Sequence, residues 1–141
     1  MAGVTAAEVW LYCDGGSRGN PGPGAIGTLV LDGAGRELES FAACIGHTTN
    51  NQAEYTALIR GLELASRHSR GRLVCVLDSQ LVVNQMSGLW RVRDSELRRL
   101  HNEAKKRAAL FTSVAYRHVG RGDRRIKQVD RALNKALDGL G

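Results

Sequence analysis

The sequence predicts an α/β fold in which a mixed five-stranded sheet is flanked by helices. The first observation is the apolar run Leu73–Leu77, which is typical of a strand buried on both faces and leads directly into Asp78. The second is the strand-like run Glu8–Cys13, which leads in the same way into Asp14. The third is the order of segments, in which three strands precede helices that alternate with two further strands.

Three strands open the chain after a lead-in at residues 1–7. We expect them at Glu8–Cys13, Ala25–Asp32 and Glu37–Ile45. Five glycines and both prolines of the chain fall between Gly15 and Gly24, which predicts a rigid turn over residues 14–27. A Gly-Ala-Gly sequence separates the second strand from the third, so the three strands should form an antiparallel meander.

Helices and the remaining strands follow in alternation. Apolar spacing and capping residues predict helices at about residues 50–68, 80–86, 95–110 and 128–140, and strands at Arg72–Asp78 and Phe111–Val119. Right-handed crossovers would set the last two strands parallel to the first. We find no repeat or linker, and expect one domain over residues 1–141 with its core at about 8–138.

Four carboxylates should converge at one end of this sheet. Asp14 and Asp78 leave neighbouring strands, Glu54 lies on the core-facing side of a helix's first turn, and Asp130 lies in the first turn of the last helix. Carboxylates this close repel one another unless a cation lies between them, and all-oxygen ligands suit Mg²⁺, with Mn²⁺ as a substitute. Glu54 could instead be a capping acid stabilised by the helix dipole.

The basic charge points to a polyanionic partner. The chain carries a net charge of +6, and residues 98–131 hold eleven Lys or Arg against three acids. Such an excess favours nucleic acid, although a basic soluble surface remains the alternative. The N-terminal segment resembles neither a signal peptide nor a membrane anchor. Three widely spaced cysteines, expected to be buried thiols, fit a reducing cytoplasm.

Five sequence blocks resemble those of type 1 ribonuclease H. They are DGGSRGNPGPGAIG, TNNQAEYTALIRGLELA, DSQLVVNQMSG, HVGR and VDRALNKALD, and the resemblance covers about residues 8–138. It implies the ribonuclease H fold and the hydrolysis of RNA in RNA/DNA hybrids by a two-metal-ion mechanism that leaves 5′-phosphate and 3′-hydroxyl ends. The acidic tetrad of the family would be Asp14, Glu54, Asp78 and Asp130. Asp123 and Asp138 are nearby alternatives for the fourth position.

The resemblance also implies roles for individual residues. Asp14 would bridge the two ions, Asp130 would hold the ion that carries the attacking water, and Glu54 and Asp78 would hold the other. His118 matches a mobile histidine that moves protons, although its spacing to Asp130 departs from that of common members. The expected substrate contacts are Ser17, Gly19, Asn20, Asn50, Asn51, Gln80 and Trp90. Asn50 and Asn51 could instead cap a helix, and Trp90 could instead be a core residue.

One departure from many bacterial members concerns the segment between the second and third helices. Only about six residues, Gly88–Arg93, join them, so the chain resembles compact forms without a basic protrusion or a hybrid-binding domain. We expect a monomer that acts on RNA/DNA hybrids. A nuclease for other substrates, such as double-stranded RNA, and a non-catalytic hybrid-binding module are the alternatives.

Overall fold

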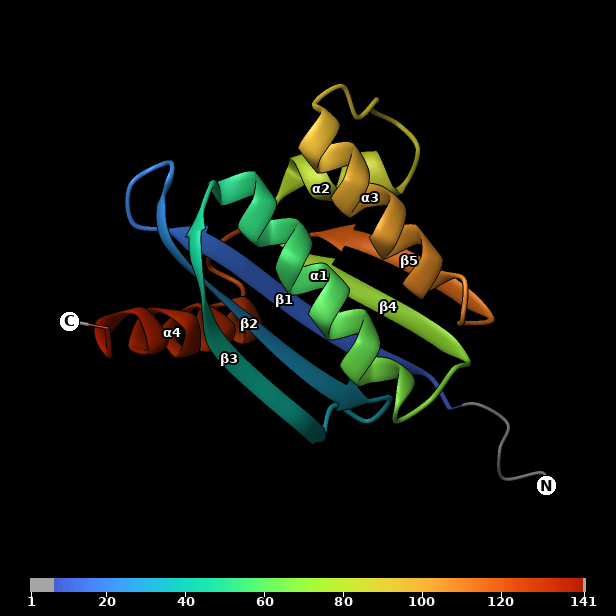
Figure 1. The fold of residues 1–141 in the computed structure, drawn as a ribbon. Helices are drawn as coiled ribbons and strands as arrows, with labels where there is room; N and C mark the ends of the chain where they lie inside the picture. The colour runs from blue at the N-terminus through green and yellow to red at the C-terminus, as the bar shows by residue number, and fades with distance from the viewer. Residues whose placement is uncertain (1–6, 141) are drawn as a thin grey trace.

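The computed structural model describes residues 7–140 and has the expected α/β architecture (Figure 1). The elements are β1 (Val9–Ser17), β2 (Gly22–Asp32), β3 (Glu37–Thr48), α1 (Asn50–Ser66), β4 (Arg72–Leu77), α2 (Gln80–Met86), α3 (Ser95–Ala108), β5 (Ser113–His118) and α4 (Arg124–Asp138). The strand order is β3-β2-β1-β4-β5. The first three strands pair antiparallel, whereas β4 pairs parallel with β1 and β5, which confirms the predicted mixed sheet.

Helices cover both faces of the sheet. The helices α1, α2 and α3 lie over one face, where Leu11, Leu58 and Leu73 belong to one large apolar core. The helix α4 lies on the opposite face and packs Val129 and Leu133 against β2. All five residues from Leu73 to Leu77 of β4 are buried, which agrees with the continuous apolar sequence of this strand.

The register of the central strands brings two acids to the same level of the sheet. Cys13 of β1 lies opposite Leu77 of β4 in the parallel pair. Asp14 and Asp78 each follow one of these paired residues in the sequence, so the two acids lie side by side at the same end of the sheet. The prediction that these strands are neighbours is confirmed.

Several element boundaries differ from the sequence prediction. The glycine-rich segment is mostly strand, because β1 continues to Ser17 and β2 resumes at Gly22. The last helix begins at Arg124 rather than at residue 128, since the side chain of Asp123 caps it by accepting hydrogen bonds from two backbone N–H groups. Asp130 therefore lies in the second turn of α4. The lead-in expected at residues 1–7 lies, apart from Ala7, outside the described residues.

Burial differs from the prediction at two apolar positions. Cys44 is only half-buried, because it lies on the edge strand β3, whereas Cys13 and Cys75 are buried on central strands. The helical spacing of apolar residues in the predicted helix 128–140 places Leu140 on its inward face, but this residue follows the end of α4 and is 63% exposed, so it does not join the apolar face of that helix.

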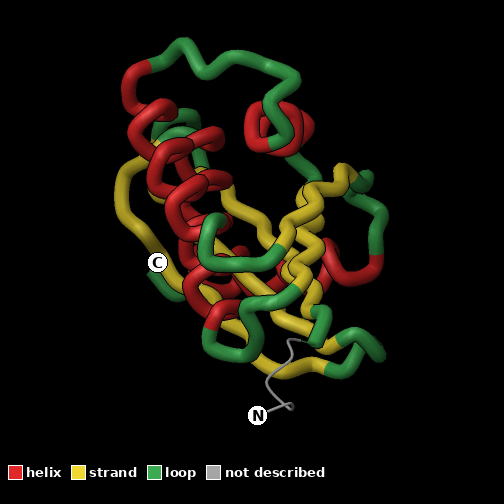
Figure 2. The backbone as a smooth tube through the Cα atoms, turned by 90° about the vertical axis from the view of Figure 1, so that its right-hand side faces the viewer, coloured by secondary structure: helices red, strands yellow, loops and turns green. Residues whose placement is uncertain are grey.

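The loop at residues 87–94 joins α2 to α3 and stands at the top of Figures 1 and 2. It is short, as expected from the sequence. Across residues 7–140, no helix combines the length and the apolar character needed to cross a membrane.

Candidate active site

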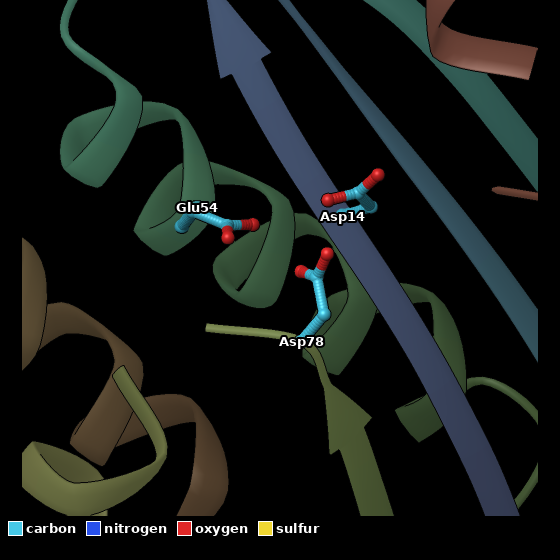
Figure 3. Close-up of side chains that lie close together, drawn as sticks. All are labelled: Asp14, Glu54 and Asp78. Carbon is cyan, nitrogen blue, oxygen red and sulfur yellow. The ribbon is translucent and has the colours of Figure 1, made fainter. Parts of the chain in front are cut away.

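Three carboxylates from three separate elements converge at one end of the sheet (Figure 3). Asp14 extends from β1, Asp78 follows β4, and Glu54 extends from α1. One oxygen of each carboxylate lies within 4.8 Å of the others. Glu54 is the fifth residue of α1, one position beyond the first turn in which it was expected.

Close packing of helix on strand brings Glu54 to this position. A Cβ atom at Gly15 would lie only 2.2 Å from the carbonyl oxygen of Ala53, so only glycine allows α1 to approach β1 this closely. The approach places the backbone N–H of Gly15 at 2.8 Å from Glu54 Oε1, to which it donates a hydrogen bond. The glycine-rich segment thus serves the site by its lack of side chains.

The surroundings of the cluster disfavour the charged form of its carboxylates. Burial, and then the charges of Glu54 and Asp78, raise the pKa of Asp14 to about 9. Burial and the charge of Asp78 raise the pKa of Glu54 to about 8, although the Gly15 N–H and the Arg121 guanidinium oppose this shift. Within the described chain, the buried Oδ1 atom of Asp78 has no hydrogen-bond partner. These features indicate a site that is stabilised by a bound cation.

The carboxylates line a cavity of about 480 Å³. Its other polar lining comes from the end of β1 and the residue after it, the start of α1, the cap of α2, the loop before α4 and α4 itself. These residues are Ser17, Arg18, Asn50, Asn51, Ser79, Arg121, Lys127, Asp130 and Asn134. Carboxylates at the floor, with amides and cations around them, suit a ligand that carries both phosphates and hydroxyl groups.

Two asparagine side chains beside the cavity, Asn50 and Asn51, make different contacts. Thr49 caps α1 and forms a capping box with Gln52, so neither Asn50 nor Asn51 is the capping residue. Asn50 Oδ1 instead accepts a hydrogen bond from the Ser17 backbone N–H at 2.9 Å, which ties α1 to the end of β1. Asn51 is exposed at the cavity wall, where its amide can contact a ligand.

Asp130 reaches the same cavity from α4. Its side chain is exposed, and its charge contributes to the raised pKa of Asp14. The two alternative acids have other partners. Asp123 caps α4, and Asp138 forms an ion pair of 2.6 Å with Arg18. Of the three acids, Asp130 alone lines the cavity.

Comparison with known proteins identifies the family. A family model described as reverse transcriptase-like matches residues 12–128. A ribonuclease HI of Halobacterium salinarum is 40% identical over 131 residues, which cover 93% of this chain and 65% of that protein. A ribonuclease H of Hydrogenovibrio crunogenus is 35% identical over 147 residues, which cover 94% of this chain and 97% of that protein. The chain belongs to the ribonuclease H family.

Solved structures of ribonucleases H share its fold. The N-terminal ribonuclease H domain of Rv2228c from Mycobacterium tuberculosis superposes with a TM-score of 0.90 at 38% identity, covering 95% of this chain and 96% of that one. A ribonuclease H1 named LC11, solved in complex with an RNA/DNA hybrid, gives a TM-score of 0.87 at 33% identity, covering 94% and 98%. The chain spans only 36% of the whole bifunctional protein Rv2228c, to which it is 41% identical over 133 residues.

Other residues suggested by the resemblance to ribonuclease H lie outside the cavity lining. Asn20 accepts a hydrogen bond from the Asn50 backbone N–H, and Gln80 is exposed at the start of α2. Gly19 lies in the turn between β1 and β2. His118 is exposed at the end of β5, so its part in catalysis stays a prediction.

Trp90 lies apart from the acids, on the loop between α2 and α3. Its side chain is 46% exposed and lines a separate hollow of about 310 Å³. An indole this exposed is not the core residue that the sequence left as an alternative.

Three cations at this site were not predicted from the sequence. Arg18, Arg121 and Lys127 line the cavity, and the charge of Arg121 lowers the pKa of Glu54. The signal for Arg121 was its place in the GRGDRR segment between the last predicted strand and the last predicted helix, within the basic stretch of residues 98–131.

The donor set of the site fits hard divalent cations. Asp14, Glu54 and Asp78 offer only carboxylate oxygens, and the group contains no His or Cys that would favour zinc. The orphaned Oδ1 of Asp78 is buried within the same group, where a metal ion would satisfy it. The residues therefore fit the metal that the family implies.

Proposed function

We propose that this chain is an endoribonuclease that hydrolyses the RNA strand of RNA/DNA hybrids. The observation that carries the proposal is the cluster of Asp14, Glu54 and Asp78, with ligand oxygens within 4.8 Å and one of them buried without a partner. Mg²⁺, or Mn²⁺ in its place, is the proposed cofactor, and Asp130 is the fourth ligand. Two such ions would supply a water of lowered pKa and stabilise charge on the leaving 3′ oxygen, which leaves 5′-phosphate and 3′-hydroxyl ends.

The protein's own groups would bind and orient the hybrid. Ser17, Asn50 and Asn51 present hydroxyl and amide groups to the cavity, and these suit the 2′-hydroxyls that distinguish RNA from DNA. Lys127 and Arg121 contribute positive charge to the lining of the same cavity, where a backbone phosphate would bind. Trp90 is proposed to contact the DNA strand outside the cavity.

A cleavage assay with matched 3′-labelled substrates tests the proposal. RNA/DNA hybrid, RNA duplex and DNA duplex of one sequence are incubated with Mg²⁺ or with EDTA. We expect Mg²⁺-dependent cuts in the RNA of the hybrid, with products that carry a 5′-phosphate downstream of each cut. The double variant Asp14→Asn/Asp78→Asn should bind the hybrid without cutting it. An intact hybrid with the wild-type protein, or full cleavage by the double variant, would overturn the proposal.

A further inference from the structure

A buried polar pair interrupts the apolar core between α1 and α2. Tyr55 of α1 is fully buried and Gln85 of α2 is 5% exposed. The Tyr55 hydroxyl donates a hydrogen bond of 2.6 Å to Gln85 Oε1. A buried amide carries a desolvation cost that only hydrogen bonds at both its ends offset, so an apolar side chain would fill this position more simply.

The other end of the Gln85 amide leads out of the core to the loop between α2 and α3. Gln85 Nε2 donates to the backbone carbonyl of Arg91 at 3.1 Å. The ring of His101, on α3, lies 3.2 Å from the backbone carbonyl of Gln85 and meets the Tyr55 ring edge-on at a centroid distance of 6.2 Å. A continuous chain of contacts therefore connects α1, just beyond Glu54, with the backbone of the loop.

Further hydrogen bonds hold the same loop from both its ends. The carbonyl of Asn84 accepts from the backbone N–H groups of Leu89 and Trp90, and the Arg98 guanidinium donates to the carbonyl of Val92. The contact with Gln85 ties the Arg91 backbone, in the middle of the loop, to the buried core, against which the neighbouring Val92 side chain also packs. The loop is thus held as a fixed element at the top of Figures 1 and 2.

The loop held in this way presents groups that suit a nucleic acid. Trp90 is 46% exposed, and a hollow of about 310 Å³ beside it is also lined by Arg91 and Lys105. Within residues 7–140, Arg91 and Arg93 form no ion pair with an acid, so their charge is available to phosphates. An aromatic ring among unpaired cations stacks on sugars or bases and neutralises a backbone.

We propose that Tyr55 and Gln85 are positioning residues that preset the 87–94 loop as a second anchor for the hybrid. The inference rests on the proposed function, because it assigns the loop to the same substrate. A preset loop loses little conformational freedom when the hybrid binds, so the pair lowers KM. The carboxylates lie on other elements, and kcat should not depend on the pair.

Three variants separate this role from a purely structural one. Gln85→Leu and Tyr55→Phe each leave a buried partner unsatisfied, whereas the double variant replaces both partners by apolar groups and restores a uniform core. Val30→Ala is the matched control, because it creates a cavity in the same core at a position on β2. For each protein, kcat, KM, the Kd for hybrid in EDTA and the unfolding midpoint are measured.

We expect Gln85→Leu to raise KM and Kd about fivefold with kcat within about twofold of wild type. The double variant should recover much of the unfolding midpoint but keep the raised KM, and Val30→Ala should lower the midpoint without raising KM. The fluorescence anisotropy of Trp90, measured in a Trp10→Phe background, should fall when Gln85 is changed, because the loop becomes mobile.

Two results would overturn the inference. One is a KM that follows the unfolding midpoint across all four variants, and the other is an unchanged Trp90 anisotropy in Gln85→Leu. Failure of the proposed function is distinguishable, since a wild-type protein that leaves hybrids intact would still report the mobility of Trp90. In that case the anisotropy alone decides whether Gln85 holds the loop.

Discussion

Removing the charge of Asp14 should abolish cleavage and yet stabilise the metal-free protein. Its pKa is about 9 in the folded chain, against an ordinary value of 3.8, because burial and the neighbouring carboxylates disfavour the charged form. At pH 7 this difference lowers the free energy of unfolding by at most about 4 kcal/mol. The substituted side chain would also bury an amide, and Glu54 and Asp78 would still repel each other, so we expect Asp14→Asn to gain roughly 2 kcal/mol.

The sign of the pH dependence follows from the direction of the shift. Between about pH 4 and pH 9 the unfolded chain releases the Asp14 proton while the folded chain retains it. The stabilisation that protonated Asp14 contributes is therefore fully present below the pKa of Asp14 in the unfolded chain, and it is lost as the pH rises towards the pKa of Asp14 in the folded chain. The advantage of Asp14→Asn should accordingly grow between pH 5 and pH 8 in EDTA, and Mg²⁺ should reduce or reverse it, because the ion stabilises the charged form.

Urea unfolding followed by circular dichroism measures the effect, in EDTA and in Mg²⁺ across this pH range. Asp138→Asn is the matched control, since its side chain is 68% exposed and its ion pair with Arg18 lies at the surface. Its free energy of unfolding should change little, and without the same pH trend. If Asp14→Asn is less stable than wild type in EDTA at pH 8, or if its advantage does not vary with pH, the account of the repulsive cluster is refuted.

Three further changes test how the site is built. Gly15→Ala forces α1 away from β1, so it should lower the free energy of unfolding in urea by about 3 kcal/mol and remove most of the cleavage activity. The control Gly16→Ala, whose added Cβ would meet no atom closer than 3.9 Å, should change both little, and equal effects of the two variants would contradict the close-packing argument. Asp123→Ala removes the N-terminal cap of α4 and should lower the free energy of unfolding by about 1 kcal/mol while cleavage persists. A complete loss of cleavage would instead favour Asp123 as the fourth metal ligand. Arg121→Gln should raise the pKa of Glu54 and shift the rise of kcat/KM with pH to higher pH, whereas Arg121→Lys should keep this rise at its wild-type pH. An unchanged pH profile in Arg121→Gln would show that Arg121 does not act on Glu54.

Much of the fold could be predicted because its signals are local. The apolar run before Asp78 indicated a strand covered on both faces, and the neighbouring strand that carries Asp14 lies beside it. The start of α4 was misplaced because Asp123 lies within a basic, glycine-containing segment whose composition is typical of a loop. The residue type alone did not identify Asp123 as the capping residue, because the acids that were predicted to bind metal are also aspartates.

The candidate site was predictable to the extent that it rests on strand ends. Asp14 and Asp78 follow from register alone, whereas the contact of Glu54 with the Gly15 backbone depends on how closely a helix packs. The approach of Arg121 depends on the path of a loop, which periodicity does not encode. The hydrogen bond between Gln85 and Arg91 could not be predicted for a similar reason, since a single glutamine in an amphipathic helix does not indicate which residues it contacts.

The position of the acids in the sheet also determines how long the site survives local opening. The strands β1 and β4 lie between other strands, whereas β3 and β5 form the edges. Amides of Val74 and Val76 should therefore exchange with deuterium only through nearly global unfolding, while amides at the edges exchange through smaller openings. The geometry of Asp14 and Asp78 would then persist through most fluctuations that loosen the periphery, and the lifetime of the competent site would approach that of the folded chain itself.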